Sequence, residues 1–406
     1  MRILHVIPSL SPIHGGPSYA MEVLARGLSS SGVDVHIATT DDDGPGRRAG
    51  VPLGEPVSID GAVRFYFKRQ TRFYKFSRPM TRWLAHNVES YDLVHVHALF
   101  SYASYSACRL ARSRGIPYII RPLGVLNKWG MEKRRPALKR LSLRLIESRL
   151  IAGAAAMHYT SEQERREAES WGVRAPGVVI PIGIEVSTEV HLPDPFIARF
   201  PFAAGRRVAL FLSRIDPKKG LEILIEAFRI VREQEPLALL VIAGEGPDHY
   251  KKALKRLADD LGVGDSILWT GFLQGADKQS ALAASRVFVL PSYSENLGIA
   301  PLEAMAAGVP CVLSDHVAIA PDVERSGAGF VVSAQPDLLA TALLGILKDG
   351  ARQQEMASKA KDLVRSRFGV GTMVSELLRL YERTARREHD KGSPHWASTA
   401  RWKSGV

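Results

Sequence analysis

Short apolar runs alternate with segments of helical period along this chain, and the whole pattern occurs twice. The strands predicted in the first half are residues 3–7, 35–38, 93–97 and 118–121. After about residue 200 the pattern starts again, and the strands predicted there are residues 208–213, 239–243, 267–269, 287–291 and 311–314. Strands that alternate with helices form parallel sheets covered by helices. We therefore expect an α/β protein with two Rossmann-like, doubly wound domains that face a central cleft.

The domain boundaries follow from this repeat. The N-terminal domain is predicted to span residues 1–190, and a C-terminal helix near residues 371–387 is expected to complete it. Residues 191–205 are rich in Pro, Ala and Phe and end in Gly, which indicates a linker. The C-terminal domain is predicted over residues 206–370. Residues 388–406 lack periodicity and are rich in Ser, His and Lys, so we expect a disordered tail.

The composition excludes several classes of protein. The chain has two cysteines, one in each half, which is too few for a disulfide framework or a cysteine metal cluster. No run of about 18 apolar residues occurs, and the N-terminal apolar run is too short for a signal peptide. A cytoplasmic location is therefore expected. The formal net charge is +12, which fits nucleic acid, an anionic membrane surface or a phosphorylated substrate as partner.

A basic loop at residues 213–220, Ser-Arg-Ile-Asp-Pro-Lys-Lys-Gly, follows a predicted strand and opens a helix. The N–H groups at a helix N-terminus attract anions, and Arg214 and Lys219 add two cations beside them. Arginine presents a planar fork to phosphate oxygens, whereas lysine presents a point charge. The loop therefore suits a phosphate group, and a solvated basic loop is the alternative.

Two glutamates follow a later strand, Glu295 in the loop and Glu303 in the first turns of the next helix. Carboxylates beside a phosphate site make chemical sense if they accept hydrogen bonds from hydroxyl groups. A sugar nucleotide has hydroxyls on both sides of its diphosphate, so one acid can hold the hexose and the other the ribose. The alternative is that Glu303 interacts with the helix dipole and Glu295 lies on the surface.

Together these segments resemble the retaining GT-B glycosyltransferases of family 4 (glycosyl transferases group 1). The resemblance rests on the basic loop, the Gly-Glu-Gly-Pro turn at residues 244–247, the two glutamates with seven residues between them and the Gly-Val-Pro at residues 308–310. It implies that Arg214 and Lys219 hold the donor diphosphate and stabilise the leaving nucleotide. Glu295 would contact the donor sugar and Glu303 the ribose. The resemblance implies further donor contacts from Gly244, Gly246, Phe272, Asn296, Leu297 and Gly298.

The N-terminal half fits the same family. Gly15 and Gly16 lie between the first strand and a helix, and they resemble the loop that approaches donor phosphate and acceptor in this family; a simple tight turn is the alternative. His97 ends a predicted strand, where α/β active sites gather, and the resemblance implies a role near the donor sugar. His95 lies two residues earlier and is interpreted as a packed core histidine. The family's Asn-Gly-Val/Ile-Asp segment is Ile-Gly-Ile-Glu here, at residues 182–185.

Eight Lys and Arg side chains and several leucines share residues 128–149. This composition suits an anionic membrane surface that carries a lipid-linked acceptor, and it equally suits a solvated helix face. The three consecutive aspartates at residues 41–43 are predicted to form a solvated loop. No required metal and no other cofactor is expected.

The predicted reaction moves a hexosyl group from a UDP-sugar or GDP-sugar to the hydroxyl of a saccharide or lipid-linked saccharide, with retention, in surface polysaccharide or glycolipid biosynthesis. The expected location is cytoplasmic. If the basic segment binds the membrane, the protein is expected at the inner face of the cell membrane. Nucleic acid is not an expected partner. The alternatives are a nucleotide-sugar epimerase of the same architecture and a non-catalytic basic protein that binds membrane or nucleic acid.

Overall fold

The computed structural model describes residues 1–44, 46–133, 135–186 and 191–392. Its internal contacts divide the chain into two compact units. The first unit contains Met1–Tyr159, Glu167–Ile180 and the chain from Met373 onward. The second contains Thr160–Arg166 and Pro181–Thr372, so both units are built from separate pieces of the chain.

The first unit is built on an eight-stranded sheet with the strand order β3-β4-β2-β1-β5-β6-β7-β8. Only β3 is antiparallel to its neighbour, and the other pairs are parallel. The strands are β1 (Arg2–Val6), β2 (Asp34–Thr40), β3 (Pro56–Ile59), β4 (Ala62–Phe67), β5 (Leu93–His97), β6 (Tyr118–Arg121), β7 (Ala156–Tyr159) and β8 (Gly177–Val179). The helices are α1 (Gly16–Ser30), α2 (Arg78–Asn87), α3 (Tyr102–Ser113), α4 (Lys128–Lys133), α5 (Pro136–Ser142), α6 (Ser148–Ala152) and α7 (Glu162–Ser170), whose first residues cluster with the second unit.

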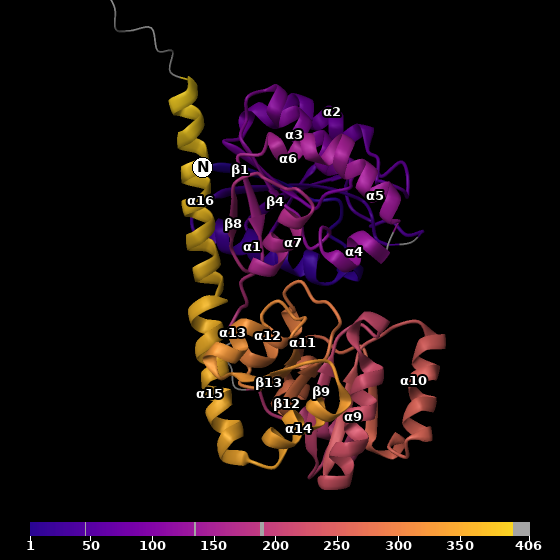
Figure 1. Cartoon of the computed structure of the whole chain (residues 1–406). Coiled ribbons are helices and arrows are strands. Elements are labelled where there is room, and N and C mark those ends of the chain that lie inside the picture. Colours follow the sequence, from indigo (N-terminus) through magenta and orange to yellow (C-terminus); the bar gives the residue numbers. More distant parts are fainter. Residues whose placement is uncertain (45, 134, 187–190, 393–406) are drawn as a thin grey trace, which may run out of the picture. The chain divides into compact units, whose positions relative to one another are not determined.

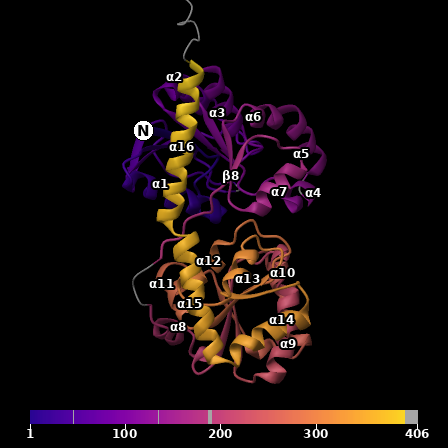
Figure 2. The same cartoon turned by 60° about the vertical axis from the view of Figure 1, so that its left-hand side comes forward.

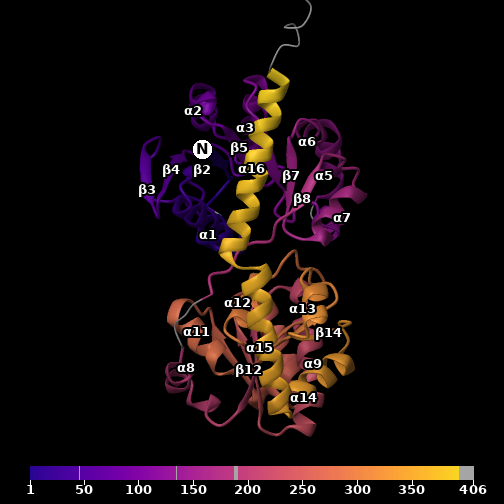
Figure 3. The same ribbon diagram turned by 90° about the vertical axis from the view of Figure 1, so that its left-hand side faces the viewer.

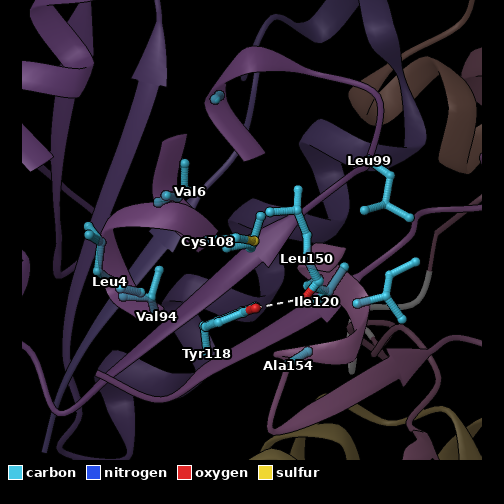
Figure 4. Packing of buried hydrophobic residues seen from close by; sticks show 14 of the residues in the cluster. Leu4, Val6, Val94, Leu99, Cys108, Tyr118, Ile120, Leu150 and Ala154 are labelled. Carbon is cyan, nitrogen blue, oxygen red and sulfur yellow. Dashed lines mark hydrogen bonds between the residues drawn. The ribbon is translucent and has the colours of Figure 1, made fainter. Parts of the chain in front are cut away.

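Alternate residues of the central strands form the apolar core on one face of this sheet. Figure 4 shows Val6, Val94 and Ile120 from three neighbouring strands beside Cys108 of α3. The hydroxyl of Tyr118 donates a hydrogen bond of 2.6 Å to the carbonyl oxygen of Leu150 in α6. The buried thiols of Cys108 and of Cys311 in the second unit are unbridged.

The C-terminal helix α16 (Val370–Gly392) belongs to the first unit from Met373 onward (Figure 3), and its buried side chains lie between Met373 and Thr384. Its Tyr381 is fully buried and is hydrogen-bonded to β5. The helix extends through residues 388–392, which were predicted to belong to the disordered tail. Helical side chains such as Leu377 and Leu380 are buried, which stabilises this helix by packing although its C-terminal sequence is polar. Residues 393–406 of the predicted tail lie outside the described residues.

The second unit has a parallel six-stranded sheet with the order β11-β10-β9-β12-β13-β14. Its strands are β9 (Arg207–Leu212), β10 (Ala238–Ala243), β11 (Ile267–Gly271), β12 (Ser285–Leu290), β13 (Cys311–Ser314) and β14 (Gly329–Val332). Its helices are α8 (Asp194–Arg199), α9 (Leu221–Gln234), α10 (Asp248–Asp260), α11 (Gly275–Ala283), α12 (Ile299–Ala306), α13 (Ala320–Ser326), α14 (Pro336–Leu347) and α15 (Gly350–Arg367). Helices α9 and α14 pack against each other (Figure 1), and α15 packs against α12 and α13 (Figure 2).

The segment 191–205, predicted as a linker, belongs to the second unit and contains α8. Phe196 of α8 is 2% exposed, and burial of this ring stabilises the short helix against the rest of the unit. Within the parts of the chain that the structure covers, no helix is both long and apolar enough to cross a bilayer.

Candidate active site

The basic loop leaves the carboxyl end of β9 and leads into α9. Asp216 caps a short 3-10 turn, η5 (Pro217–Lys219), by accepting a hydrogen bond of 3.0 Å from the N–H of Lys218. Gly220 has a φ of +68°, and a Cβ placed there would lie 2.3 Å from the carbonyl oxygen of Pro291. Glycine is therefore required where this loop packs against the end of β12.

Gly244 and Gly246 support the basic loop from the adjacent strand. A Cβ on Gly244 would lie 1.9 Å from the carbonyl oxygen of Ser213, and one on Gly246 would lie 2.0 Å from that of Ile215. The N–H of Ile215 donates a hydrogen bond of 2.8 Å to the carbonyl oxygen of Glu245. The family resemblance implied donor contacts from both glycines. The close approach that the structure shows is to the loop that carries Arg214.

Lys219 and Glu295 form a partly buried ion pair between their Nζ and Oε2 atoms. Lys219 is 8% exposed. Burial tends to raise the pKa of Glu295, but the charges of Lys219, Lys218 and Arg214 lower it below its ordinary value. Glu295 is therefore a carboxylate at neutral pH, and it can accept hydrogen bonds from hydroxyl groups.

Glu303 lies near the start of α12 and pairs with Lys278 of α11, whose Nζ is 2.8 Å from its Oε1. Both side chains are partly shielded from solvent. Lys278 was not found by sequence reasoning, since it stands on a helix without a recognisable phosphate-binding pattern. In the sequence, Lys278 is marked only by being the first cation after Phe272.

The residues between the two glutamates are fixed in different ways. The amide of Asn296 donates a hydrogen bond of 2.9 Å to the hydroxyl of Thr160, which the sequence did not single out. Leu297 is 3% exposed, so its side chain anchors the loop, and Gly298 has a φ of +84° just before α12. Phe272, at the end of β11, is 66% exposed and offers a flat apolar surface.

In the first unit, Gly15 has a φ of +65° and precedes Gly16, the first residue of α1. His97 is the last residue of β5 and is 1% exposed, with its Nε2 3.0 Å from Nδ1 of His5. Burial, followed by the charges of His5 and Arg121, lowers the pKa of His97 well below its ordinary value. Its imidazole is therefore neutral near pH 7.

His95 belongs to a buried chain of hydrogen bonds, in agreement with its interpretation as a core histidine. His158 Nε2 lies 2.9 Å from the carbonyl oxygen of Ile180, so that nitrogen carries the proton. His158 Nδ1 then accepts from Nε2 of His95 at 3.3 Å, and Nδ1 of His95 accepts from the hydroxyl of Tyr381 at 2.8 Å. His5, His95 and His97 could also hold a metal ion, because their nitrogens lie within 4.8 Å of one another. The hydrogen bonds already engage both nitrogens of His95.

The aspartates predicted to form a solvated loop are instead largely buried. Asp41 is 2% and Asp42 is 3% exposed. Asp42 forms ion pairs with Arg69 and with Lys75, the latter at 2.7 Å. The solvated-loop prediction was wrong because cations that lie 27 and 33 residues further along the chain neutralise the buried carboxylate.

Comparison with known proteins gives two family matches. The model described as "Glycosyl transferase 4-like domain" matches residues 15–183, and the model described as "Glycosyl transferases group 1" matches residues 195–363. A GDP-mannose-dependent α-(1-6)-phosphatidylinositol monomannoside mannosyltransferase of Mycobacterium tuberculosis is 30% identical over 247 residues, which cover 58% of this chain and 63% of that relative. A phosphatidyl-myo-inositol mannosyltransferase of Mycolicibacterium smegmatis is 28% identical over 94% of both chains.

Among solved structures, Anabaena HepE in complex with UDP-glucose superposes with a TM-score of 0.73. The two chains are 19% identical, and the match covers 94% of this chain and 100% of HepE. This likeness confirms the predicted fold of two Rossmann-like units. With the two family matches on either side of residue 190, the chain belongs to the GT-B glycosyltransferases of the glycosyl transferases group 1 family.

Proposed function

We propose that this glycosyltransferase moves a hexosyl group from a nucleoside diphosphate sugar to an acceptor hydroxyl, with retention, in glycolipid or surface polysaccharide biosynthesis. The observation that carries the proposal is the partly buried pair of Lys219 and ionised Glu295 beside Arg214. It places cations and a hydrogen-bond acceptor together at the carboxyl edge of the sheet. A donor diphosphate needs the cations, and its hexose hydroxyls need the carboxylate.

The chemistry follows from where charge develops. When the anomeric bond breaks, the diphosphate gains negative charge, which Arg214 and Lys219 stabilise electrostatically. Glu295 holds the hexose in position, and Glu303 accepts hydrogen bonds from the ribose. The departing phosphate takes the acceptor proton, so a dedicated protein base is not needed. Because Arg214 and Lys219 supply the positive charge, no metal is required, and we expect EDTA to leave the rate unchanged.

The relatives suggest two donor sugars, which we rank in the order in which they should be tested. Both sequence relatives named above are mannosyltransferases, one of them GDP-mannose-dependent, whereas the HepE structure holds UDP-glucose. GDP-mannose is therefore the first donor to test and UDP-glucose the second. A donor at a free concentration of a hundred times its Kd stabilises the folded protein by about 2.7 kcal/mol, which a thermal-shift measurement detects.

The decisive experiment measures sugar transfer by Glu295→Gln, Glu303→Gln and Arg214→Gln with the donor that shifts the melting temperature. We expect Glu295→Gln and Arg214→Gln to lower kcat/KM by about a hundredfold or more, because each removes charge that acts on the donor. Glu226→Gln, an exposed residue of α9, is the matched control and should behave as the wild type. Full activity of Glu295→Gln and Glu303→Gln would overturn the proposal. An altered sugar nucleotide formed without any acceptor would indicate an epimerase instead.

A further inference from the structure

A pocket of about 530 Å³ opens in the first unit at the carboxyl end of its sheet. Pro8, which follows β1, and Leu99–Ser101, which follow β5, form one side of it. The loop at residues 72–75 and Arg135 form the other side. Ligands of α/β proteins bind at this edge of a sheet, and the volume is that of a small-molecule site.

The pocket is positively charged. Arg72, Lys75 and Arg135 line it, and no carboxylate is among its described lining residues. Lys75 shares the carboxylate of Asp42 with Arg69, and its Nζ lies 2.7 Å from Asp42 Oδ2. Within the described chain, Arg72 and Arg135 have no carboxylate at ion-pair distance; the guanidinium of Arg135 lies 5.2 Å from the ring centre of Phe73. Two uncompensated guanidinium groups in one concave wall suit a phosphate group.

The backbone around the pocket is held in an unfavourable conformation. Tyr74, Lys75, Phe100 and Arg135 all line the pocket, and their φ angles are +58°, +48°, +54° and +53°. Left-handed backbone in residues other than glycine costs about 1 kcal/mol or more and gathers at ligand sites. Four such residues around one pocket indicate a site that the fold maintains against strain.

An apolar stripe follows Arg135 along the chain. It consists of Leu138, Leu141, Leu145 and Ile146 on α5 and the following π-helical turn η3 (Leu143–Glu147), which are 47%, 55%, 50% and 37% exposed. Exposed arginines flank it at positions 140, 144 and 149. Exposed leucines surrounded by cations suit the surface of an anionic bilayer. A helix face that contacts only water would carry polar residues at these positions.

The stripe and the pocket share structure. Arg135 lines the pocket and immediately precedes α5. The Nζ of Lys139 lies 5.8 Å from the ring centre of Phe100, whose N–H donates a hydrogen bond of 3.2 Å to Glu147 at the end of η3. A molecule with a phosphate in the pocket can therefore extend its apolar part along the stripe.

We propose that the acceptor is an anionic phospholipid with a hydroxyl-bearing head group, whose phosphate binds between Arg72 and Arg135 while its acyl chains and the bilayer surface contact the leucine stripe. This assignment rests on the proposed glycosyl transfer and specifies its acceptor. The head-group hydroxyl is the nucleophile. Its oxygen forms the new bond to the anomeric carbon, the bond to the nucleoside diphosphate breaks, and the proton leaves with the diphosphate.

The first test is sedimentation of the full chain with vesicles of phosphatidylcholine alone and of phosphatidylcholine with a quarter of phosphatidylglycerol. We expect binding to the anionic vesicles only. Leu141→Ser with Leu145→Ser should lower the partition coefficient about tenfold or more, since each leucine loses its contact with the acyl region. Leu237→Ser with Leu338→Ser removes two leucines of similar exposure from the second unit and should have no effect.

The second test separates the pocket from the surface. Glycerol 1-phosphate is titrated calorimetrically into the wild type and into Arg72→Gln with Arg135→Gln, which should weaken binding at least about tenfold because a charge-assisted hydrogen bond is lost. Arg140→Gln with Arg144→Gln removes the same charge outside the pocket and should retain glycerol 1-phosphate binding. It should lower vesicle binding about fivefold per arginine.

Each failure has its own signature. If no nucleotide sugar raises the melting temperature of the wild type, the proposed function fails. If a donor binds and is used, but the Arg72 and Arg135 substitutions leave glycerol 1-phosphate binding and lipid glycosylation unchanged, the acceptor assignment fails. Equal binding to neutral vesicles, or a dimer that the leucine substitutions dissociate, would also overturn it.

Discussion

Glu147 is a fully buried carboxyl group, and its replacement by glutamine tests the packing of the loop that forms the acceptor pocket. Burial raises its pKa from 4.5 to about 7, although hydrogen bonds from Phe100 and Ser142 act in the opposite direction. Since each pKa unit corresponds to about 1.4 kcal/mol, ionising Glu147 in the folded protein costs about 3 kcal/mol more than in the unfolded chain.

The direction of the pH effect follows from proton binding. Between about pH 4.5 and pH 7 the folded chain holds a proton on Glu147 that the unfolded chain releases, so stability from this group falls as the pH rises through that window. Glutamine does not ionise and keeps an oxygen that can accept from the N–H of Phe100. We therefore expect Glu147→Gln to match the wild type near pH 4.5 and to be about 3 kcal/mol more stable above about pH 8.

Urea unfolding followed by tryptophan fluorescence at about pH 4.5 and about pH 8.5 measures this difference. Glu89→Gln is the matched control, because Glu89 carries the same group in the same unit with its side chain 58% exposed. The reasoning is refuted if the stability difference between Glu147→Gln and the wild type is the same at both pH values. It is also refuted if Glu89→Gln shows the same pH dependence.

Two further substitutions test the buried networks. Tyr381→Phe leaves Nδ1 of His95 without its donor, so we expect a loss of about 1–2 kcal/mol in urea unfolding, and an unchanged midpoint would contradict the hydrogen-bond chain. Gly244→Ala forces a Cβ against the carbonyl oxygen of Ser213, so it should cost about 2 kcal/mol and weaken donor binding, whereas Gly350→Ala, with open space around it, should be neutral in both assays.

The strands that line the functional edges could be predicted from the sequence because they are continuous apolar runs. Residues 93–97, 118–121 and 311–314 were predicted with the same bounds that the structure gives to β5, β6 and β13. Five strands were missed, namely β3, β4, β7, β8 and β14. Arg64 interrupts the apolar pattern of β4, and the edge strand β3 is largely exposed. The residues next to Arg64 in the sequence do not indicate that it is buried, because its ion-pair partner Glu22 lies on α1, about 40 residues earlier in the chain.

The candidate donor residues could be singled out in the sequence because short motifs hold them at fixed spacing. Their juxtaposition follows from strand order. Lys219 and Glu295 follow β9 and β12, which are neighbours in the sheet, so two loops 76 residues apart in the sequence meet at one edge. Lys278 and Thr160 could not be found in this way. Each contributes a single polar contact from a segment without a motif, and only the packing of α11 and of the 160–166 segment reveals it.

The acceptor pocket shows why the remaining part of the site needed the structure. Its lining comes from four separate segments of the chain, around Pro8, residues 72–75, residues 99–101 and Arg135. No sequence motif links these segments. What distinguishes Arg72 and Arg135 is the absence of a carboxylate beside them in the described chain, together with left-handed backbone at Arg135 and its neighbours in the wall. Neither property is encoded by residue type at a given spacing. A basic loop whose charges are paired, such as the one around Asp42, has the same composition and cannot bind an anion in the same way. In this unit the cations around Asp42 form a paired charge cluster, whereas Arg72 and Arg135 combine unpaired charge with a place in the lining of a pocket.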